Sequence, residues 1–186
     1  MPELTTDRPP LTDSLLALDP AAQALLFTEA RTANTFSDEP VSDEQLRAIV
    51  ELAKWPPTAA NVNPLRILFV SSPEARARLV GHMSEGNAPK TAAAPAVAVL
   101  AADEELRERQ ARFNSALQAA YFIIAIRAAG LAAGPMGGFD GPGIDAEFFA
   151  GRPWKSILVV NIGRPGIDPW LDRLPRLDYD EMVEHI

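Results

Sequence analysis

The sequence predicts an α+β or α/β sandwich, because segments with helical periodicity alternate along it with short apolar runs that are typical of strands. The chain has 186 residues, near the usual size of one domain, so we expect a single core. Hydrophobic residues make up 47% of it and charged residues 23%, as in an ordinary globular protein. We expect this domain to span residues 20–186, after an extended arm over residues 1–19.

Prolines and one capping motif define the elements at the start of the chain. Four prolines within the first twenty residues predict that the arm over 1–19 forms no regular structure. Apolar residues at helical spacing then predict a helix over 21–31. Ser42, with Gln45 three residues later, forms a capping-box pattern, so a second helix begins there and ends before Pro56.

The length and periodicity of the apolar runs predict the remaining elements. Residues 66–70, 96–101 and 157–161 are short apolar runs, and each predicts a buried strand. Residues 73–83 predict a helix between the first two of these strands. Residues 115–129 predict a longer helix that is apolar almost all round, which implies burial on several sides.

The apolar helix over 115–129 leaves two alternatives open. A second subunit shares its surface, or it is the central core helix of a monomer. A membrane span fits less well, because Gln118, Arg127 and Gly130 interrupt the apolar run. We therefore expect a buried helix, with Gly134 in the turn that caps its C-terminus.

Charge and cysteine content exclude several classes of function. The formal net charge of -8 at pH 7 is unfavourable for a surface that holds a nucleic-acid backbone, although a local basic pocket for one phosphate is compatible with it. The chain contains no cysteine, which excludes disulfides, thiolate nucleophiles and cysteine metal sites. Residues 1–20 lack the apolar segment of a secretory signal, so we expect a cytoplasmic protein.

Few side chains are available for covalent or acid–base chemistry. The two histidines, His82 and His185, lie far apart without partners at metal-ligand spacing, so we expect surface residues and no metal site. No G-x-S-x-G nucleophile elbow occurs. The glycine-rich stretch 134–143 matches neither a Walker loop nor G-x-G-x-x-G, and it follows a predicted helix rather than a strand. This pattern favours a bound organic cofactor that carries the reaction.

Five separated segments carry a more specific signal through their order and spacing. They are ARTAN (30–34), PTAANVNP (57–64), NAPK (87–90), GPMGGFD (134–140) and RLPRL (173–177). Together they resemble the FMN-dependent nitroreductase family, most closely its malonic semialdehyde reductase, or 3-hydroxypropanoate dehydrogenase, branch. The resemblance implies a three-layer α/β/α sandwich with a central, mainly antiparallel sheet. It also implies an intertwined homodimer with FMN at the subunit interface.

Arginines are the residues that the resemblance assigns to the FMN phosphate. Arg31 and Arg173 match the family positions, and a guanidinium fork suits a dianionic phosphate because it donates paired, charged hydrogen bonds. The alternative for Arg31 is a solvated arginine on a polar helix face. Leu171 stands where the family often has a basic residue, so we expect Arg176 or Arg164 to compensate.

The other segments are assigned by the resemblance to the flavin ring. Residues 57–64 would run beside the isoalloxazine, and Asn87 with Lys90 would reach its pyrimidine edge and the ribityl chain. The backbone of Gly137 and Gly138 would face the flavin N5, since glycine allows close approach. The implied cofactor-binding residues are Arg31, Thr32, Asn34, Pro57, Thr58, Ala59, Asn61, Asn87, Lys90, Pro135, Met136, Gly137, Gly138, Arg173 and Arg176.

The activity that the resemblance implies is hydride transfer from NADH or NADPH, through flavin N5, to a small electrophilic acceptor. The acceptor would be an aldehyde, a nitro compound, a quinone or an enone, with no side chain needed as a catalytic acid. The alternatives are a flavin-dependent oxidase or dehydrogenase of the same fold and a non-catalytic flavin-binding protein. Residues 103–113 are shorter than the lid of the named branch. This predicts a more open pocket, or one closed by the N-terminal arm.

Overall fold

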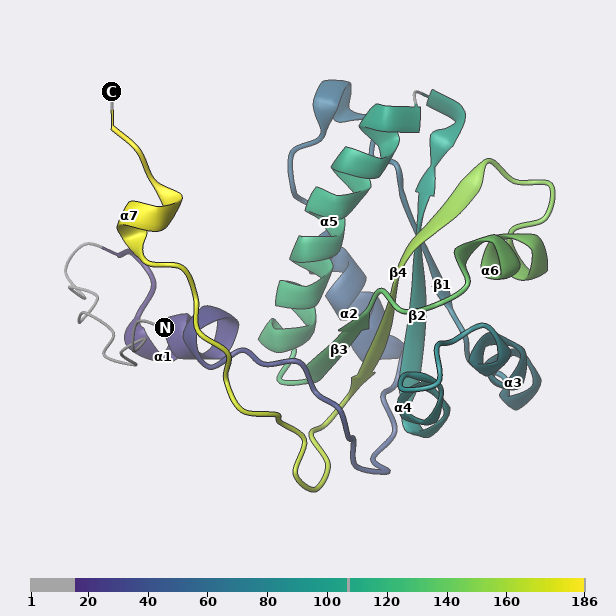
Figure 1. Cartoon of the computed structure of the whole chain (residues 1–186), viewed down its shortest axis with the longest axis horizontal. Helices are drawn as coiled ribbons and strands as arrows, with labels where there is room; N and C mark the ends of the chain where they lie inside the picture. The colour runs from purple at the N-terminus through teal and green to yellow at the C-terminus, as the bar shows by residue number, and fades with distance from the viewer. Residues whose placement is uncertain (1–15, 107, 186) are drawn as a thin grey trace.

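One antiparallel sheet forms the centre of the molecule (Figure 1). The computed structural model describes residues 16–106 and 108–185. The strand order is β1-β2-β4-β3, and each neighbouring pair is antiparallel. The predicted α+β class and mainly antiparallel sheet are therefore confirmed. The strands are β1 (Leu65–Phe69), β2 (Ala96–Asp103), β3 (Ala132–Met136) and β4 (Trp154–Gly163).

Helices cover both faces of this sheet and complete a three-layer α/β/α sandwich (Figure 1). Alternate residues of β2 point to opposite faces, as strand geometry requires. Ala98 and Leu100 belong to one hydrophobic cluster, and Val97 and Val99 belong to the other. The first cluster lies under α2 (Asp43–Ala53) and α5 (Glu108–Ala128), and the second under α3 (Pro73–Gly81), α4 (Ala88–Ala93) and α6 (Gly141–Phe148).

The sequence missed β3, and two expectations about the glycine-rich stretch are wrong as a result. Gly134 lies inside β3 rather than in a helix cap, so the stretch begins within a strand and does not follow a helix directly. Gly and Pro weaken a strand pattern, but β3 is an edge strand, where Pro135 is tolerated. Gly130, with φ of +74°, is the second residue after the end of α5 and supplies the left-handed residue expected at a helix end.

For the first two helices, the predicted starts agree with the structure better than the predicted ends. The predicted helix over 21–31 is instead α1 (Pro20–Gln23), followed by a π-helical turn, η2 (Ala24–Thr28). The capping box of α2 is confirmed, because the Gln45 N–H donates to Ser42 Oγ at 3.2 Å and the Ser42 N–H donates to Gln45 Oε1 at 2.9 Å. Of the expected arm over 1–19, only residues 16–19 lie within the described chain.

α5 is longer than predicted and is buried on one side only. Phe122 and Ile126 lie in the core, whereas Phe113, Leu117 and Tyr121 are exposed. These three residues are spaced four apart, so they form one apolar stripe on the outer side of the helix. The expectation that one chain buries this helix on several sides is therefore wrong, and the sharing of α5 with a second subunit stays a prediction. Among the described residues, no helix has the length and apolar character needed to cross a membrane.

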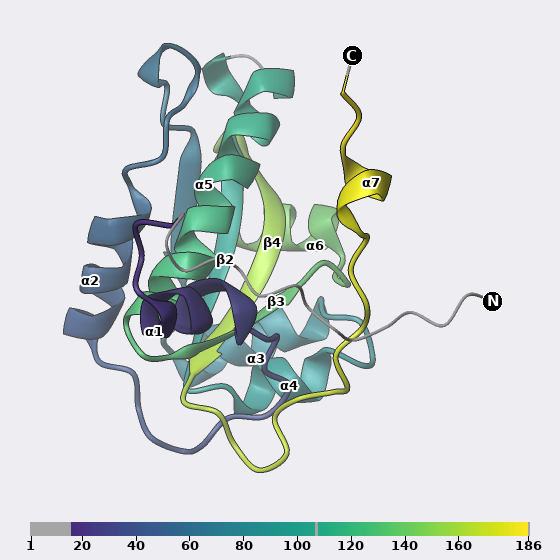
Figure 2. The same cartoon turned by 90° about the vertical axis from the view of Figure 1, so that its left-hand side faces the viewer.

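The chain after β4 runs back along the segment that follows η2. The Ser37 N–H donates to Arg164 O, the Gly166 N–H donates to Thr35 O, and the Asn34 N–H donates to Pro169 O. Beyond this pairing the C-terminal segment extends outward to a short helix, α7 (Tyr179–Met182), which stands apart from the sandwich in Figures 1 and 2.

Candidate functional site

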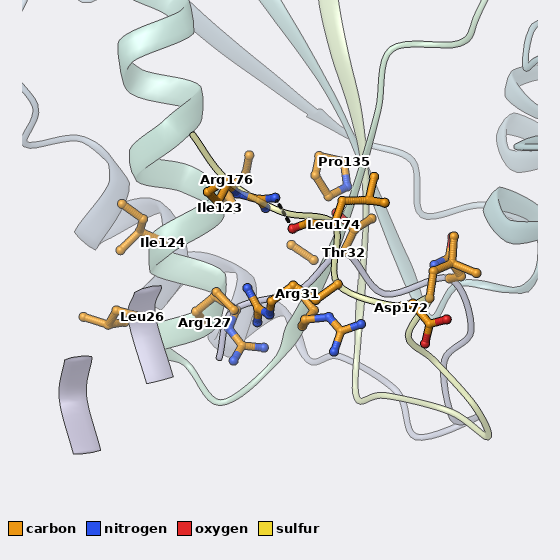
Figure 3. A pocket seen from close by; sticks show the side chains of 15 residues that line it. Leu26, Arg31, Thr32, Ile123, Ile124, Arg127, Pro135, Asp172, Leu174 and Arg176 are labelled. Carbon is orange, nitrogen blue, oxygen red and sulfur yellow. Dashed lines mark hydrogen bonds between the residues drawn. The ribbon is translucent and has the colours of Figure 1, made fainter. Parts of the chain in front are cut away.

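A hollow of about 390 Å³ lies between α5, the segment after η2 and the C-terminal segment (Figure 3). We call it the arginine pocket. Backbone hydrogen bonds bring its walls together: the Ala33 N–H donates to Ala133 O, and the Asn34 N–H donates to Pro169 O, both at 2.9 Å. Six of the residues predicted from the sequence line this pocket: Arg31, Thr32, Asn34, Pro135, Arg173 and Arg176.

Positive charge dominates the arginine pocket. The guanidinium groups of Arg31, Arg127, Arg173 and Arg176 line it, and Asp172 is the one carboxylate among its described lining residues. Within the described part of the chain, none of these arginines forms an ion pair with a carboxylate. Such a concentration of cations in a chain of net charge -8 is suited to an anionic ligand.

Sequence reasoning missed Arg127 as a member of the pocket. The sequence contained one signal, a charged residue in an otherwise apolar helix. Burial lowers the pKa of Arg127 from its usual value, although an arginine remains protonated in proteins. The expected compensation by Arg164 is wrong, because Arg164 pairs with Glu39 at 2.7 Å and does not line the pocket.

Lys90 joins the pocket to the other face of the sheet. Its Nζ donates a hydrogen bond of 2.8 Å to Oδ1 of Asn34, a residue of the arginine pocket. Lys90 lies in α4, and Asn87 is the N-cap residue of that helix. The N-x-x-K spacing therefore puts both side chains near the first turn of one short helix.

Asn87 also contacts the glycine turn, which we define as Gly137–Gly138. Its Nδ2 donates to Gly138 O at 3.1 Å, and the Ser84 N–H donates to the same oxygen at 3.1 Å. A Cβ atom at Gly138 would lie 2.8 Å from both Asn87 Nδ2 and Ser84 Oγ, whereas one at Gly137 would meet no atom within 4 Å. The turn is packed on one side and open at Gly137.

Met136, which precedes the glycine turn, contributes to packing through its side chain. The side chain is 7% exposed and belongs to the second hydrophobic cluster. Its sulfur accepts contacts from Thr91 Oγ1 at 3.9 Å and from Asn161 Nδ2 at 3.8 Å. Only the backbone of Met136 is therefore suited to the predicted cofactor contact.

The structure separates the segment 57–64, which we call the proline loop, from the arginine pocket. The Ala59 N–H donates to Asn114 Oδ1 at 2.8 Å, in the N-terminal half of α5. Arg127 follows thirteen residues later on the same helix, which corresponds to about 20 Å along its axis. One chain therefore does not bring Pro57 and Asn61 to the residues that line the arginine pocket.

Backbone strain is concentrated in the proline loop. Ala60, Asn61 and Asn63 adopt φ angles of 50°, 55° and 45°, in the left-handed region that favours glycine. Asparagine tolerates this region, but alanine adopts it at a cost of about 1–3 kcal/mol. The Asn63 N–H donates to Thr58 Oγ1 at 3.2 Å, and Asn63 Nδ2 donates to Asn61 Oδ1 at 3.0 Å. The loop is thus held in a defined, costly shape.

The described residues of the segment expected as a shortened lid form no separate excursion. Residues Glu104–Leu106 make one turn of 3-10 helix, and α5 begins at Glu108. Arg112 of α5 forms an ion pair with Glu104, and Asp103 pairs with Arg66 at 2.6 Å. These contacts bind the segment to the sandwich.

Comparisons of the sequence with a family model and with curated proteins both identify nitroreductases as similar proteins. The sequence model of the Nitroreductase family matches residues 28–116. A Streptomyces coelicolor protein named "Putative NADH dehydrogenase/NAD(P)H nitroreductase" is 56% identical over 192 residues, covering 90% of this chain and 97% of its own length.

Two solved structures share the fold at low sequence identity. A nitroreductase family protein from Streptococcus pneumoniae TIGR4 matches with a TM-score of 0.76 and 20% identity, covering 87% of this chain and 98% of its own. A structure from Exiguobacterium sibiricum 255-15, in complex with FMN, matches with a TM-score of 0.73 and 19% identity, covering 84% and 93%.

Proposed function

The chain belongs to the nitroreductase family, and from that premise we propose that it is an NAD(P)H-dependent flavin oxidoreductase with FMN as its cofactor. The Streptomyces relative is named for NAD(P)H, and the Exiguobacterium structure contains FMN. One observation carries the proposal. The arginine pocket, the Lys90–Asn34 contact and the glycine turn form one continuous series of groups suited to a phosphate, a polar chain and a flat ring.

The residues of the arginine pocket fit the phosphate end of FMN. A dianionic phosphate accepts several charged hydrogen bonds, and guanidinium forks supply them in pairs. Arg31 and Arg173 come from opposite ends of the chain and line one pocket, and neither is paired with a carboxylate of the described chain. Their charges are therefore available to hold the phosphate.

The residues beyond the pocket fit the ring of FMN. When bound, FMN supplies the redox step, in which its N5 accepts hydride from NADH or NADPH and passes it to an acceptor. Lys90 brings a positive charge beside the pocket, and such a charge favours an electron-rich ring. The open side of Gly137 leaves room for a ring to lie against the backbone, while Asn87 fixes the turn from behind.

We propose further that the enzyme works as a homodimer with FMN at the subunit interface. The apolar stripe of α5 (Phe113, Leu117 and Tyr121) is exposed to solvent in the single chain, and packing against a second copy of the chain would bury it. The strained proline loop lies about 20 Å along α5 from the arginine pocket of its own chain. A partner subunit could therefore supply the loop to that pocket.

The acceptor in this proposal is a small electrophile: an aldehyde, a nitro compound, a quinone or an enone. The malonic semialdehyde reductase branch remains the more specific proposal. Residues Glu104–Leu106 and α5 leave no separate lid among the described residues, which favours an open site that admits different small acceptors. We also propose that residues 20–186 form one domain in a cytoplasmic protein.

Flavin binding and its reduction test this function directly. Purified protein should bind FMN, become yellow, and lose its visible flavin absorbance when NADH or NADPH is added without oxygen. Arg31→Gln should weaken FMN binding about tenfold to hundredfold, because a charged hydrogen bond to the phosphate is lost. Arg164→Gln removes an equal charge outside the pocket and is the matched control.

Two results would contradict the proposal in different ways. Wild-type protein that cannot be loaded with FMN would remove the cofactor and everything that depends on it. Protein that binds FMN, yet is reduced by neither nicotinamide, would exclude the reductase and favour a flavin oxidase or a non-catalytic flavin-binding protein.

A further inference from the structure

The position of the Arg127 guanidinium is not explained by contacts within α5. It lies in the last turn of α5 and lines the arginine pocket (Figure 3). Its Nε donates a hydrogen bond of 3.1 Å to Leu25 O in η2. Within the described part of the chain, its two terminal NH₂ groups have no hydrogen-bond partner and no carboxylate. Four N–H donors are thus free in a pocket that already contains other cations.

The helix C-terminus alone does not account for this placement. A basic residue in a last turn interacts favourably with the terminal carbonyl groups, and an arginine turned toward solvent gains the same effect. Arg127 instead shares a pocket with Arg31, Arg173 and Arg176, where like charges repel one another. In a chain with 25 acidic and 17 basic side chains, no described carboxylate pairs with these cations. A bound anionic ligand would supply a counter-charge for these cations.

The side chains around Arg127 in the pocket are mainly apolar. Ile123 and Ile124 of the same helix line the pocket beside it, so that side of the pocket is otherwise apolar. Partial burial removes water from the guanidinium and strengthens its attraction for an anion. Arg176 is less free, because its NH1 group donates to Leu174 O at 3.0 Å and to Pro175 O at 3.3 Å.

We propose that Arg127 is a ligand of the FMN phosphate, in addition to Arg31 and Arg173. This inference rests on the proposed function, because it requires FMN in the arginine pocket. The Nε of Arg127 stays bonded to Leu25 O, which fixes the plane of the guanidinium, and the terminal NH₂ groups donate to a phosphate oxygen. The pocket therefore recognises the phosphate from three chain segments: the segment after η2, α5 and the C-terminal segment.

Riboflavin, which lacks the phosphate, separates this role from a structural one. The experiment measures the Kd of FMN and the Kd of riboflavin for wild type, Arg127→Gln and Arg127→Lys. In Arg127→Gln the Kd of FMN should rise about tenfold to hundredfold. The Kd of riboflavin should change less than about threefold, since no charge-dependent contact to it is lost. Arg127→Lys keeps the charge without the fork and should give an intermediate Kd for FMN.

The matched control is Arg47→Gln, which removes an equal charge from an exposed position of α2. It should leave both Kd values unchanged. Melting temperatures report whether the Arg127 variants, which lose the hydrogen bond to Leu25 O, are less stable than wild type. If Arg127→Gln is unstable, Arg127→Lys provides the test instead. Its Kd for FMN is then compared with its Kd for riboflavin, because riboflavin binding reports the folded fraction of the protein. A rise in the Kd of FMN alone shows that the guanidinium fork contacts the phosphate.

Each other outcome counts against the inference. Equal weakening of FMN and riboflavin by Arg127→Gln means that the side chain only supports the local structure. An unchanged Kd for FMN means that the phosphate is bound without Arg127, while the proposed function stands. Wild-type protein that binds neither flavin removes the proposed function, and this inference with it.

Discussion

Gly137 and Gly138 are neighbours in sequence with opposite surroundings. A Cβ atom at Gly138 would press on the side chains of Asn87 and Ser84 at 2.8 Å, whereas one at Gly137 would point into open space. The absence of a side chain at Gly138 is thus explained by packing within the chain. At Gly137 the chain itself offers no such reason, which agrees with a ligand on the open side.

Alanine at each glycine should therefore have a different effect. Gly138→Ala should lower stability by about 1–3 kcal/mol, because the added methyl group forces Asn87 and Ser84 to move. Gly137→Ala should leave stability within about 0.5 kcal/mol of wild type, yet weaken flavin binding and slow NAD(P)H-dependent reduction. Thermal unfolding and FMN titration of both variants measure these effects. A destabilised Gly137→Ala variant that binds FMN normally would refute this division of roles.

At the scale of elements, α4 is held in place by a residue of a different helix. Arg76 of α3 donates from NH1 to Thr91 O at 3.0 Å and to Ala94 O at 2.7 Å, and from NH2 to Val70 O at 3.2 Å. Partial burial lowers the pKa of Arg76, and the guanidinium still remains charged. Because α4 also carries Lys90, Arg76 fixes the helix from which Lys90 reaches Asn34.

Loss of this guanidinium should destabilise the protein measurably. Arg76→Met leaves three carbonyl groups without a donor, and we expect a loss of about 2–3 kcal/mol. That loss corresponds to a melting temperature lower by roughly 5–10 °C. Arg78→Gln is the control on the same helix, since it removes an ion pair with Glu147 and a cation–π contact with Phe148, both at the surface. Equal melting temperatures for the two variants would show that Arg76 has no anchoring role.

At the scale of the whole molecule, large apolar side chains are exposed in several places, and two of these places bear on the proposed dimer. One is the outer stripe of α5, and the other is the C-terminal segment, where Leu171, Leu174 and Leu177 are each more than 60% exposed. Figures 1 and 2 show this segment running outward to α7, away from the sandwich. Surfaces of this kind in a folded chain are typical of an interface between subunits.

A charge in the α5 stripe should therefore break the proposed dimer. Leu117→Glu introduces a carboxylate into the interface, and we expect a monomer with weakened FMN binding. Ala77→Glu adds the same charge at an exposed position of α3, on the other face of the sheet, and should remain dimeric. Light scattering after gel filtration gives the mass of each variant. A monomeric wild type would refute the dimer without affecting the fold.

Much of the fold was accessible from the sequence because the signals for it are local. The capping box at Ser42, the apolar runs of β1, β2 and β4 and the periodicity of α5 each depend on interactions within a few residues. β3 was missed for the same reason. Its glycine and proline oppose a strand locally, and it forms only because β4 offers a partner.

The sequence by itself determined the class of the fold, the family and three of the four arginines in the arginine pocket: Arg31, Arg173 and Arg176. The tertiary structure alone decided that Arg127 joins Arg31 and Arg173, that Lys90 reaches Asn34 from a helix, and that the proline loop lies apart from them. The physical reason is chain distance. A pocket is made where segments about a hundred residues apart pack together, and no local pattern records which charges meet there.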